Sequence, residues 1–368
     1  MKIAYVHSIC NRYDAISGAI NNEIGWLQKR GHEVTFYAYS CEYDHLPHRQ
    51  VEAERDVVFD LRFQESDLAI FHFGVYYPLF NTVIATPKSA KRLVIFHNIT
   101  PKEFVSPAAR ETIDRSFKQI SNMAFSQLVI CDSETNRNVL SAAGVTVPTS
   151  VIPLSIQNIP KSVRSKPSFS DHVPRIVFVG RLVASKGVLD LLEAVRRILQ
   201  ASPNRRLQMD MIGNLSFSDP QVVEEAKCRI QTLESTYDGL SIELHGNATE
   251  VKKYQVLSEA DLFVLPTLHE GFCIPILEAL SNGCRVVTYE NSNTPAISGG
   301  FADLVETGNL DALSATVSRV LEEVSSDSWR NQGGHALWAK SALQYTKQFS
   351  PDAVEAQFIR AVERFAGS

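Results

Sequence analysis

The strongest constraint on the fold is a regular alternation of short apolar segments with longer helical patterns, which runs through the chain twice. Each apolar segment is rich in β-branched and aromatic residues, the composition of strands. The first series is KIAYVH (2–7), EVTFYAY (33–39), DLAIFHF (67–73), RLVIFHN (92–98), QLVICDS (127–133) and SVIPL (150–154). The second series is RIVFVG (175–180), LQMDMIG (207–213), LSIELHG (240–246), DLFVLP (261–266) and CRVVTYE (284–290). Because strands that alternate with helices are typical of parallel sheets, the sequence predicts two doubly wound, Rossmann-like α/β domains.

A stretch rich in proline and serine separates the two series. Residues 158–174, NIPKSVRSKPSFSDHVP, carry three prolines and little apolar content, which indicates a linker. We therefore expect an N-terminal domain over 1–157 and a C-terminal domain over 175–350. The amphipathic stretch at 351–368 is expected to pack back on the N-terminal domain as a helix. Ligands of open parallel sheets bind beyond the carboxyl ends of the strands, so two such domains facing each other would form a cleft there.

The composition excludes several classes of function. The 368 residues are 44% hydrophobic and 21% charged, which is enough apolar content for two buried cores. A net charge of −5 and a pI near 6.1 give no global electrostatic case for binding nucleic acid. The six cysteines form no C-x-x-C pair, which favours reduced thiols, a cytoplasmic compartment and no structural metal. The first ten residues lack a signal-peptide core, and the most apolar stretch, 68–80, is interrupted by His72, Gly74 and Pro78, so neither export nor a membrane span is expected.

The segment PTLHEGFCIPILEAL (266–280) is the most informative about chemistry. It places Glu270 at a strand end, then a short loop, then a helix that begins near 274–275, because proline is favoured in the first helical turn. Backbone N–H groups at such a positive helix end suit a phosphate; here they belong to Phe272, Cys273 and Ile274. Glu278, in or just past the first turn, could accept two hydrogen bonds from a ribose diol, and Glu270 could meet sugar hydroxyls. A surface loop followed by an acidic helix start is the alternative interpretation.

The same segment resembles a known family. Its pattern E-G-F-x-x-P-x-x-E-A is similar to the signature of family 4 retaining glycosyltransferases, which have the two-domain GT-B fold. The resemblance implies that Glu278 holds the nucleotide ribose, that Glu270 contacts the donor sugar, and that Gly271 belongs to the loop against the donor phosphates. A short motif is a hypothesis that needs its structural context.

A second segment supplies that context. FVGRLVASKGVLDLLEA (178–194) resembles the stretch that follows the first strand of the second domain in this family, with Gly180, Arg181, Lys186 and Gly187 matching. A sugar leaves as a nucleoside diphosphate, so negative charge grows on the phosphate oxygens during transfer. A guanidinium and an ammonium nearby would stabilise that charge most in the transition state. Solvated loop charges are the alternative.

Weaker matches extend the resemblance over most of the chain. The run 244–267 is similar to the strand, glycine, helix and strand that close around the base, which would place His245, Gly246 and Asn247 near the nucleotide. VICDSETNRNVL (129–140) resembles a late segment of the first domain, where Ser133 is expected to cap a helix rather than to act in chemistry.

Two places in the first domain are candidates for contact with the donor sugar. FHNITP (96–101) ends a strand with His97, and family members often carry a histidine here, close to the reacting carbon of the donor sugar. A neutral ring at this position could form a hydrogen bond with a sugar hydroxyl. His72 ends a neighbouring strand and competes for this role, at lower rank. Family members usually have a glycine pair in the loop after the first strand, whereas this chain offers Gly18 alone between Ser17 and Ala19.

Other departures from the family pattern concern the second domain. Ala296 stands where a glutamate often follows the proline, and Cys273 replaces a common glycine. The catalytic residues that the resemblance implies are His97, Glu270, Arg181 and Lys186. The donor-binding residues that it implies are Gly18, Gly180, Arg181, Lys186, Gly246, Asn247, Glu270, Gly271, Phe272, Cys273, Ile274 and Glu278.

The resemblance implies a retaining transferase that moves a hexose from a GDP- or UDP-hexose donor to a glycan or lipid-linked acceptor. No clear second carboxylate in the first domain is placed to act as a nucleophile, and the resemblance implies a front-face displacement instead. No metal cofactor is expected, because two cations accompany a helix N-terminus and no Asp-x-Asp lies near a strand end. A lipid-linked acceptor would bring the first domain to the inner face of a membrane, for which Lys88, Lys91, Arg92 and Lys102 are available. Another GT-B enzyme such as a nucleotide-sugar epimerase, and an inactive nucleotide-sugar-binding module, remain open. A dinucleotide-dependent oxidoreductase is excluded, because residues 7–18 contain no G-x-G-x-x-G turn.

Overall fold

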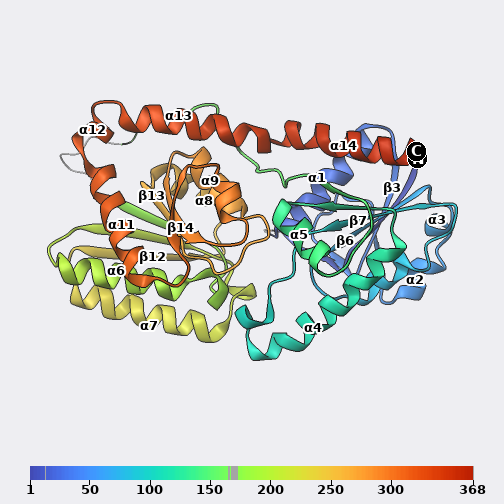
Figure 1. Ribbon diagram of the computed structural model, residues 1–368, viewed down its shortest axis with the longest axis horizontal. Helices are drawn as coiled ribbons and strands as arrows, with labels where there is room; N and C mark the ends of the chain where they lie inside the picture. The colour runs from blue at the N-terminus through green and yellow to red at the C-terminus, as the bar shows by residue number, and fades with distance from the viewer. Residues whose placement is uncertain (13, 165, 167–172, 368) are drawn as a thin grey trace. The chain divides into compact units, whose positions relative to one another are not determined.

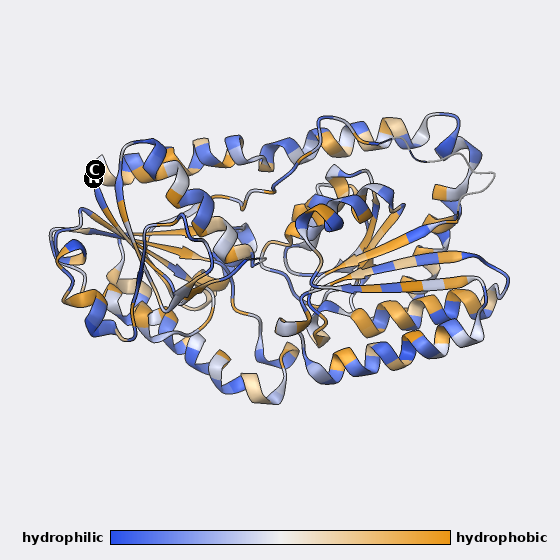
Figure 2. Cartoon of the chain, turned by 180° about the vertical axis from the view of Figure 1, so that it is seen from behind, coloured by the Kyte–Doolittle hydropathy of each residue, from blue (hydrophilic) through white to orange (hydrophobic). Residues whose placement is uncertain are grey.

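The computed structural model describes residues 1–12, 14–164, 166 and 173–367, which form two compact units. The first unit comprises residues 1–102, 107–155 and the residues from Phe349 onward, and the second comprises Glu103–Ser106 and Ile156–Gln348. In each unit helices cover both faces of a sheet (Figure 1). The strands of both sheets are largely hydrophobic, as the orange colouring of Figure 2 shows. Strands buried on both faces by crossover helices are expected to have this composition.

The sheet of the first unit has seven strands in the order β5-β3-β1-β6-β7-β8-β9, and every neighbouring pair is parallel. Its strands are β1 (Lys2–Val6), β3 (Glu33–Ala38), β5 (His48–Gln50), β6 (Leu68–Phe73), β7 (Lys91–Phe96), β8 (Leu128–Cys131) and β9 (Thr149–Val151). Each of the six segments predicted in this half overlaps one of these strands. The sequence does not predict β5, or the small sheet of β2 (Ile9–Cys10) and β4 (Ser40–Cys41), because these strands are two or three residues long.

The sheet of the second unit has six strands in the order β12-β11-β10-β13-β14-β15, again all parallel. Its strands are β10 (Arg175–Val179), β11 (Leu207–Ile212), β12 (Leu240–Gly246), β13 (Leu262–Leu265), β14 (Arg285–Glu290) and β15 (Ala302–Glu306). The five predicted segments are strands, and β15 is an additional edge strand. The prediction of two doubly wound parallel α/β units is therefore confirmed.

Helices connect the strands in both units. Those of the first unit are α1 (Ala15–Lys29), α2 (Glu54–Val58), α3 (Leu61–Gln64), α4 (Arg110–Gln119), α5 (Glu134–Ala142) and α14 (Pro351–Gly367). Those of the second are α6 (Val188–Ala201), α7 (Pro220–Thr236), α8 (Glu250–Glu259), α9 (Ile274–Ser281), α10 (Thr294–Ser298), α11 (Leu310–Ser325), α12 (Asp327–Arg330) and α13 (Gly334–Thr346). In α6 the buried Leu191, Val195 and Ile198 recur at helical spacing, so one apolar face covers the sheet. Within the described part of the chain, no helix is both long and apolar enough to span a bilayer.

The last helix packs on the first unit. The rings of Trp26 on α1 and Phe358 on α14 lie 5.9 Å apart, and both residues belong to the hydrophobic core of that unit. Lys91, at the start of β7, donates a hydrogen bond to the carbonyl oxygen of Phe365 at 2.6 Å. The chain thus returns to its first unit after completing the second.

The predicted linker lies partly outside the described residues. Those described between 158 and 174 form no helix or strand. Lys166 is buried, and its ammonium donates to the carbonyl oxygens of Ser258 and Ala260 at 3.0 and 2.5 Å. This lysine fastens the segment to the carboxyl end of α8.

Candidate functional site

Two loops of the second unit, 184–187 after β10 and 266–270 after β13, are held together by backbone contacts. The N–H of Leu268 and the hydroxyl of Thr267 both donate to the carbonyl oxygen of Ser185, at 2.8 and 3.0 Å. Gly187 adopts a left-handed conformation with φ of 65°, and a Cβ atom there would lie 1.9 Å from the carbonyl oxygen of Pro266. Only glycine allows this approach.

The joined loops bring together two of the predicted residues. Lys186 Nζ lies 2.6 Å from Glu270 Oε1, although 84 positions separate the two residues in the sequence. The side chain of Lys186 is 20% exposed and that of Glu270 is 8% exposed. A partly exposed ammonium beside a carboxylate provides one donor and one acceptor within a few ångströms, an arrangement that suits an anionic, hydroxyl-bearing ligand.

Helix α9 begins at Ile274, as the sequence predicts, with Pro275 in its first turn and Cys273 as the N-cap residue. Cys273 has φ of 80°, a left-handed conformation uncommon outside glycine, which accounts for the glycine that the family often carries here. Burial, together with the charge of Glu270, raises the pKa of the Cys273 thiol well above its ordinary value. The thiol therefore remains protonated. The carbonyl oxygen of Phe272 accepts a hydrogen bond from Asn293 Nδ2 at 2.9 Å, which ties the loop to the residues after β14.

Glu278 on α9 is buried and is held by two residues of α8. Its Oε1 atom accepts from Lys253 Nζ at 2.8 Å and lies 2.9 Å from the Tyr254 hydroxyl. Burial lowers the pKa of Lys253, but the charges of Glu278 and Glu250 outweigh burial and hold that pKa above its ordinary value. The contacts from Lys253 and Tyr254 reach Oε1 of Glu278 and not Oε2.

Sequence reasoning missed Lys253 and Tyr254 as partners of Glu278. They lie 25 and 24 positions before Glu278, on a helix whose sequence carries only an ordinary amphipathic pattern. No local spacing could have identified the contact, because it arises from the packing of α8 beside α9.

The other predicted donor-binding positions of the second unit have different surroundings. Arg181 is exposed, and its guanidinium forms no ion pair with any residue that the structure describes. A Cβ atom at Gly180 would meet only ordinary contacts, the shortest at 3.4 Å. Gly246 ends β12 with φ of 58°, and Asn247 Oδ1 accepts a hydrogen bond from the backbone N–H of Leu215 at 2.9 Å. The Asn247 amide oxygen thus holds a neighbouring loop.

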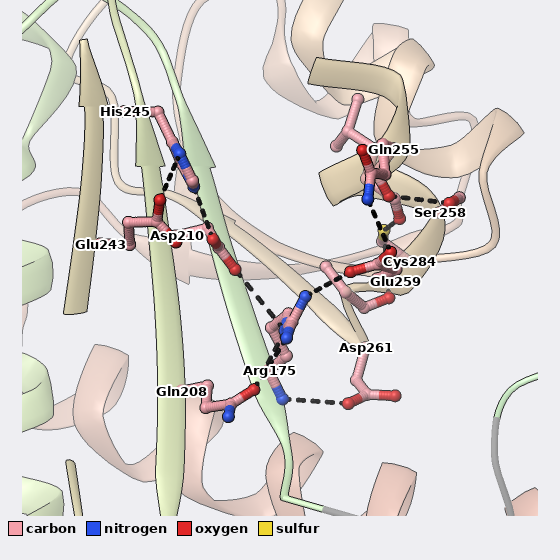
Figure 3. A network of polar contacts seen from close by, with 12 residues as sticks. Arg175, Gln208, Asp210, Glu243, His245, Gln255, Ser258, Glu259, Asp261 and Cys284 are labelled. Carbon is pink, nitrogen blue, oxygen red and sulfur yellow. Dashed lines mark hydrogen bonds and ion pairs between the residues drawn. The ribbon is translucent and has the colours of Figure 1, made fainter. Parts of the chain in front are cut away.

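His245 lies within a polar network of the second sheet (Figure 3). Its Nε2 is 2.6 Å from Asp210 Oδ1, and its Nδ1 is 3.1 Å from Glu243 Oε1. Among the described residues, these three are the one group of His, Cys, Asp and Glu side chains close enough to share a cation. Arg175 already supplies positive charge there, with Nε 3.6 Å from Asp210 Oδ2 and Nη1 bonded to Glu259 at 2.6 Å. The network braces the strands, and both His245 nitrogens are occupied.

His97 lies in the first unit, directly after β7, and is 8% exposed. Its Nδ1 is 2.7 Å from Asp132 Oδ2 and its Nε2 is 2.7 Å from His72 Nδ1. Both ring nitrogens therefore have protein partners, which the sequence does not predict. A hydroxyl could bond to either nitrogen only in place of Asp132 or His72. His72 is fully buried, and its other nitrogen meets Glu23.

The remaining first-unit predictions concern helix starts. Ser133 caps α5 by accepting a hydrogen bond from the N–H of Asn136 at 3.1 Å, so its predicted role as a cap is confirmed. Asp14 caps α1, and Gly18 lies in the first turn of that helix. A Cβ atom at Gly18 would meet nothing within 4 Å, which leaves open space beside the backbone.

Comparison with known proteins agrees with these observations. The sequence profile of "Glycosyl transferases group 1" matches residues 173–323. The O-antigen chain mannosyltransferase B of Escherichia coli is 27% identical over 188 residues, 50% of this chain and 44% of that protein. The MMP alpha-(1->4)-mannosyltransferase of Mycolicibacterium hassiacum is 27% identical over 189 residues, 50% of this chain and 43% of that protein. The chain thus spans less than half the length of these relatives.

Solved structures match over the full chain. A glycosyltransferase from Rickettsia africae superposes with a TM-score of 0.76 at 16% identity, covering 99% of this chain and 98% of that one. Sucrose-phosphate synthase from Thermosynechococcus elongatus superposes with a TM-score of 0.73 at 16% identity, covering 100% and 99%. Identities this low establish the fold alone.

Proposed function

We propose that this chain, which has the GT-B fold and carries a group 1 (family 4) glycosyltransferase domain, is a retaining hexosyltransferase. It would move a hexose from a nucleoside diphosphate donor to an acceptor hydroxyl. The observation that carries the proposal is the contact of Lys186 with Glu270 at 2.6 Å. Two segments predicted independently from sequence meet there, and Glu278 follows on the helix that begins directly after the Glu270 loop.

The proposed roles follow from charge. Arg181 and Lys186 stabilise the negative charge that grows on the leaving diphosphate, and the contact with Glu270 holds Lys186 in place before the reaction begins. Glu278 accepts hydrogen bonds from the ribose hydroxyls through Oε2, while Lys253 and Tyr254 hold Oε1. The loop from Gly271 to Ile274 meets the phosphates at the N-terminus of α9. Gly180 directly follows β10 and Gly246 ends β12, and Asn247 keeps the neighbouring loop in place.

Retention of configuration follows from a front-face displacement. The bond between the anomeric carbon and the phosphate oxygen breaks, and the acceptor oxygen bonds to the anomeric carbon on the same face. The leaving phosphate oxygen takes the acceptor proton, so the protein supplies position and charge rather than a base. The proposed role of Glu270 is to hold donor-sugar hydroxyls. His97 is the residue of the first unit that we propose to act on the donor sugar.

The proposed donors are GDP- and UDP-hexoses, and the proposed acceptors are glycans or lipid-linked glycans. Mannose is the first hexose to test, because the names of two relatives specify mannosyl transfer. A lipid-linked acceptor would require contact with a membrane surface, which vesicle co-sedimentation with and without the acceptor lipid would measure.

A panel of GDP-mannose, GDP-glucose, UDP-glucose and UDP-galactose, each with and without an oligosaccharide acceptor, tests the proposal. Release of nucleoside diphosphate that depends on acceptor supports a transferase. Conversion of the donor sugar to its epimer without acceptor would support the epimerase alternative. Donor binding in calorimetry without any turnover would support an inactive binding module.

A further inference from the structure

The first unit contains a buried chain of ionisable side chains drawn from four elements. Glu23 Oε2 on α1 is 3.0 Å from His72 Nε2 on β6. His72 Nδ1 is 2.7 Å from His97 Nε2, directly after β7, and His97 Nδ1 is 2.7 Å from Asp132 Oδ2, directly after β8. The two rings are stacked, with centroids 5.0 Å apart. All four residues are buried.

The three contacts of this chain require a definite number of protons. Each contact needs one hydrogen between its two heavy atoms, so three protons must lie along the chain. Two neutral imidazole rings carry one proton each, which accounts for two. The third must reside on a ring, as an imidazolium, or on one of the carboxyl groups. Two neutral rings and two carboxylates contain two protons between them. The geometry therefore requires one proton more than that.

The residues around these four side chains supply hydrogen-bond donors and few charges. The Tyr5 hydroxyl donates to Glu23 Oε2 at 2.7 Å, and the Tyr77 hydroxyl donates to the carbonyl oxygen of His72 at 2.6 Å. His7 faces the His72 ring edge-on, with Nδ1 3.3 Å from the His72 carbonyl oxygen. Burial and the neighbouring histidines lower the pKa of His7 to about 3, so His7 stays neutral. Asp14, which caps α1, is the further charged group whose field reaches His97.

The main chain also fixes His97. Its carbonyl oxygen accepts a hydrogen bond from Asn136 Nδ2 at 3.1 Å, and its N–H donates to the carbonyl oxygen of Phe73 at 2.9 Å. The next residue, Asn98, has φ of 118°, a conformation that non-glycine residues seldom adopt. A residue restrained through both its ring and its backbone has little orientational freedom.

We propose that Glu23, His72 and Asp132 are positioning residues for His97, and that the four side chains share one excess proton in a buried chain. The shared proton keeps a hydrogen on His97 Nδ1, toward Asp132, whether the extra proton resides on His97 or on Glu23. The polarity of the His97 ring is therefore the same for these two positions of the proton. The effect on turnover rests on the proposed function, whereas the sharing of the proton does not.

The direction of each pKa shift agrees with this distribution. Burial raises the pKa of Glu23 to about 7, against the opposing effects of Tyr5 and His97. Burial and the charge of His97 lower the pKa of His72 well below its ordinary value. Burial lowers the pKa of His97, but the charge and the hydrogen bond of Asp132 outweigh it and leave that pKa raised. These directions favour a proton at the Glu23 end or on His97 over a second proton on His72.

Two isosteric substitutions impose opposite polarities on the chain. In Glu23→Gln the amide donates to His72, so both rings become neutral with hydrogen on Nδ1, and His97 still donates to the carboxylate of Asp132. In Asp132→Asn the amide donates to His97 Nδ1, so both rings become neutral with hydrogen on Nε2. Nitrogen-15 NMR of histidine-labelled full-length protein distinguishes these tautomers. The control is Glu363→Gln, an exposed carboxylate on α14 that lies 3.8 Å from Arg30, outside the chain.

We expect both rings to carry hydrogen on Nδ1 in Glu23→Gln and on Nε2 in Asp132→Asn. The control should give the wild-type spectrum. Identical tautomers in both variants, or rings that titrate independently, would overturn the proton-sharing chain even in an active enzyme. Thermal unfolding and the unchanged signals of distant histidines verify that each variant is folded.

Turnover provides the second arm, with GDP-mannose and UDP-glucose as donors. Asp132→Asn should lower turnover on the order of 100-fold, because it reverses the polarity of the His97 ring. Wild-type turnover should fall as pH rises through about 7, where the chain loses its proton, and Glu23→Gln should lose this dependence. Unchanged turnover in Asp132→Asn, despite a reversed tautomer, would remove the positioning role. Wild-type protein that releases no nucleoside diphosphate contradicts the proposed function instead, and the NMR result stands apart from it.

Discussion

In the second unit, each of the two motif glutamates is paired with a lysine, whereas in the first unit two carboxylates are joined through two imidazole rings. The lysine pairs involve loops and helix starts at the carboxyl ends of strands, and Lys186 remains 20% exposed. The imidazole chain is buried throughout. The second unit therefore holds fixed charge pairs, whereas in the proposed proton-sharing chain of the first unit the position of one proton depends on its neighbours. Fixed cations suit the stabilisation of a leaving diphosphate. A shared proton suits the control of how the His97 ring is oriented.

The largest expected effect comes from removing a fixed cation. Lys186→Ala should lower turnover roughly 100- to 1000-fold, with a smaller effect on donor affinity, because the charge that Lys186 meets grows in the transition state. Steady-state kinetics with the best donor of the panel measures both. The control is Lys227→Ala, an exposed lysine on α7 that is paired with Glu224 at 2.8 Å. Equal losses in both variants would show that Lys186 acts only through stability.

The sequence could predict the local structure around Glu270 and Glu278 because that information is local. Glu270 and Glu278 are separated by one loop and one helix turn, so their spacing determines their relation, and the proline places the start of α9. The sequence does not predict the contact of Lys186 with Glu270, which lie 84 positions apart, because the resemblance only assigns both residues to the donor site. The contacts of Lys253 and Tyr254 with Glu278 depend on helix packing that no spacing encodes.

The first unit was less predictable for the same reason. His97 and His72 could be placed at strand ends, but their pairing depends on the parallel register that aligns His72 with Ile95 on β7. The sequence around Glu23 predicts an amphipathic helix, and nothing in it indicates that the Glu23 side chain is buried. The edge strands β5 and β15 carry HRQ and ADLVE, which are too short or too polar to differ from loops.

The buried chain should appear in the pH dependence of stability. The pKa of Glu23 is raised in the folded state, so its contribution to stability is complete below about pH 4.5 and is lost as pH rises through about 7. Relative to Glu23→Gln, wild type should lose about 3 kcal/mol of unfolding free energy across this range. The raised pKa of His97 acts with the same sign. Urea titrations from pH 4.5 to 8 measure the unfolding free energy of both proteins. Parallel curves of this free energy against pH would contradict a raised pKa of the buried Glu23.

The nucleotide contact should give a smaller effect. Glu278→Gln keeps the shape but loses charge-assisted hydrogen bonds worth about 1.5–3 kcal/mol, which corresponds to roughly a 10- to 100-fold weaker Kd for the nucleoside diphosphate. Calorimetry with GDP and UDP measures the change. The matched control is Glu290→Gln, an exposed glutamate at the end of β14. Unchanged affinity in Glu278→Gln would remove this residue from the site.

The smallest expected effect is that of a chelator. In the proposed mechanism Arg181 and Lys186 provide the positive charge for the diphosphate, so turnover should continue in EDTA at nearly the rate found without it. Assays of the same preparation before and after chelation measure this directly. Loss of activity that manganese or magnesium restores would show that a metal ion stabilises the charge of the diphosphate. The proposed role of Arg181 and Lys186 would then be reduced.

The central claim is transfer of a hexose with retention, and the product itself tests it most directly. GDP-mannose and UDP-glucose labelled with carbon-13 at C1 are each incubated with acceptor, and NMR follows the anomeric carbon. We predict that the label appears in a glycoside with the donor's anomeric configuration, at the rate at which nucleoside diphosphate is released. A product of opposite configuration, or a label that changes only by epimerisation of the free donor, would contradict the account.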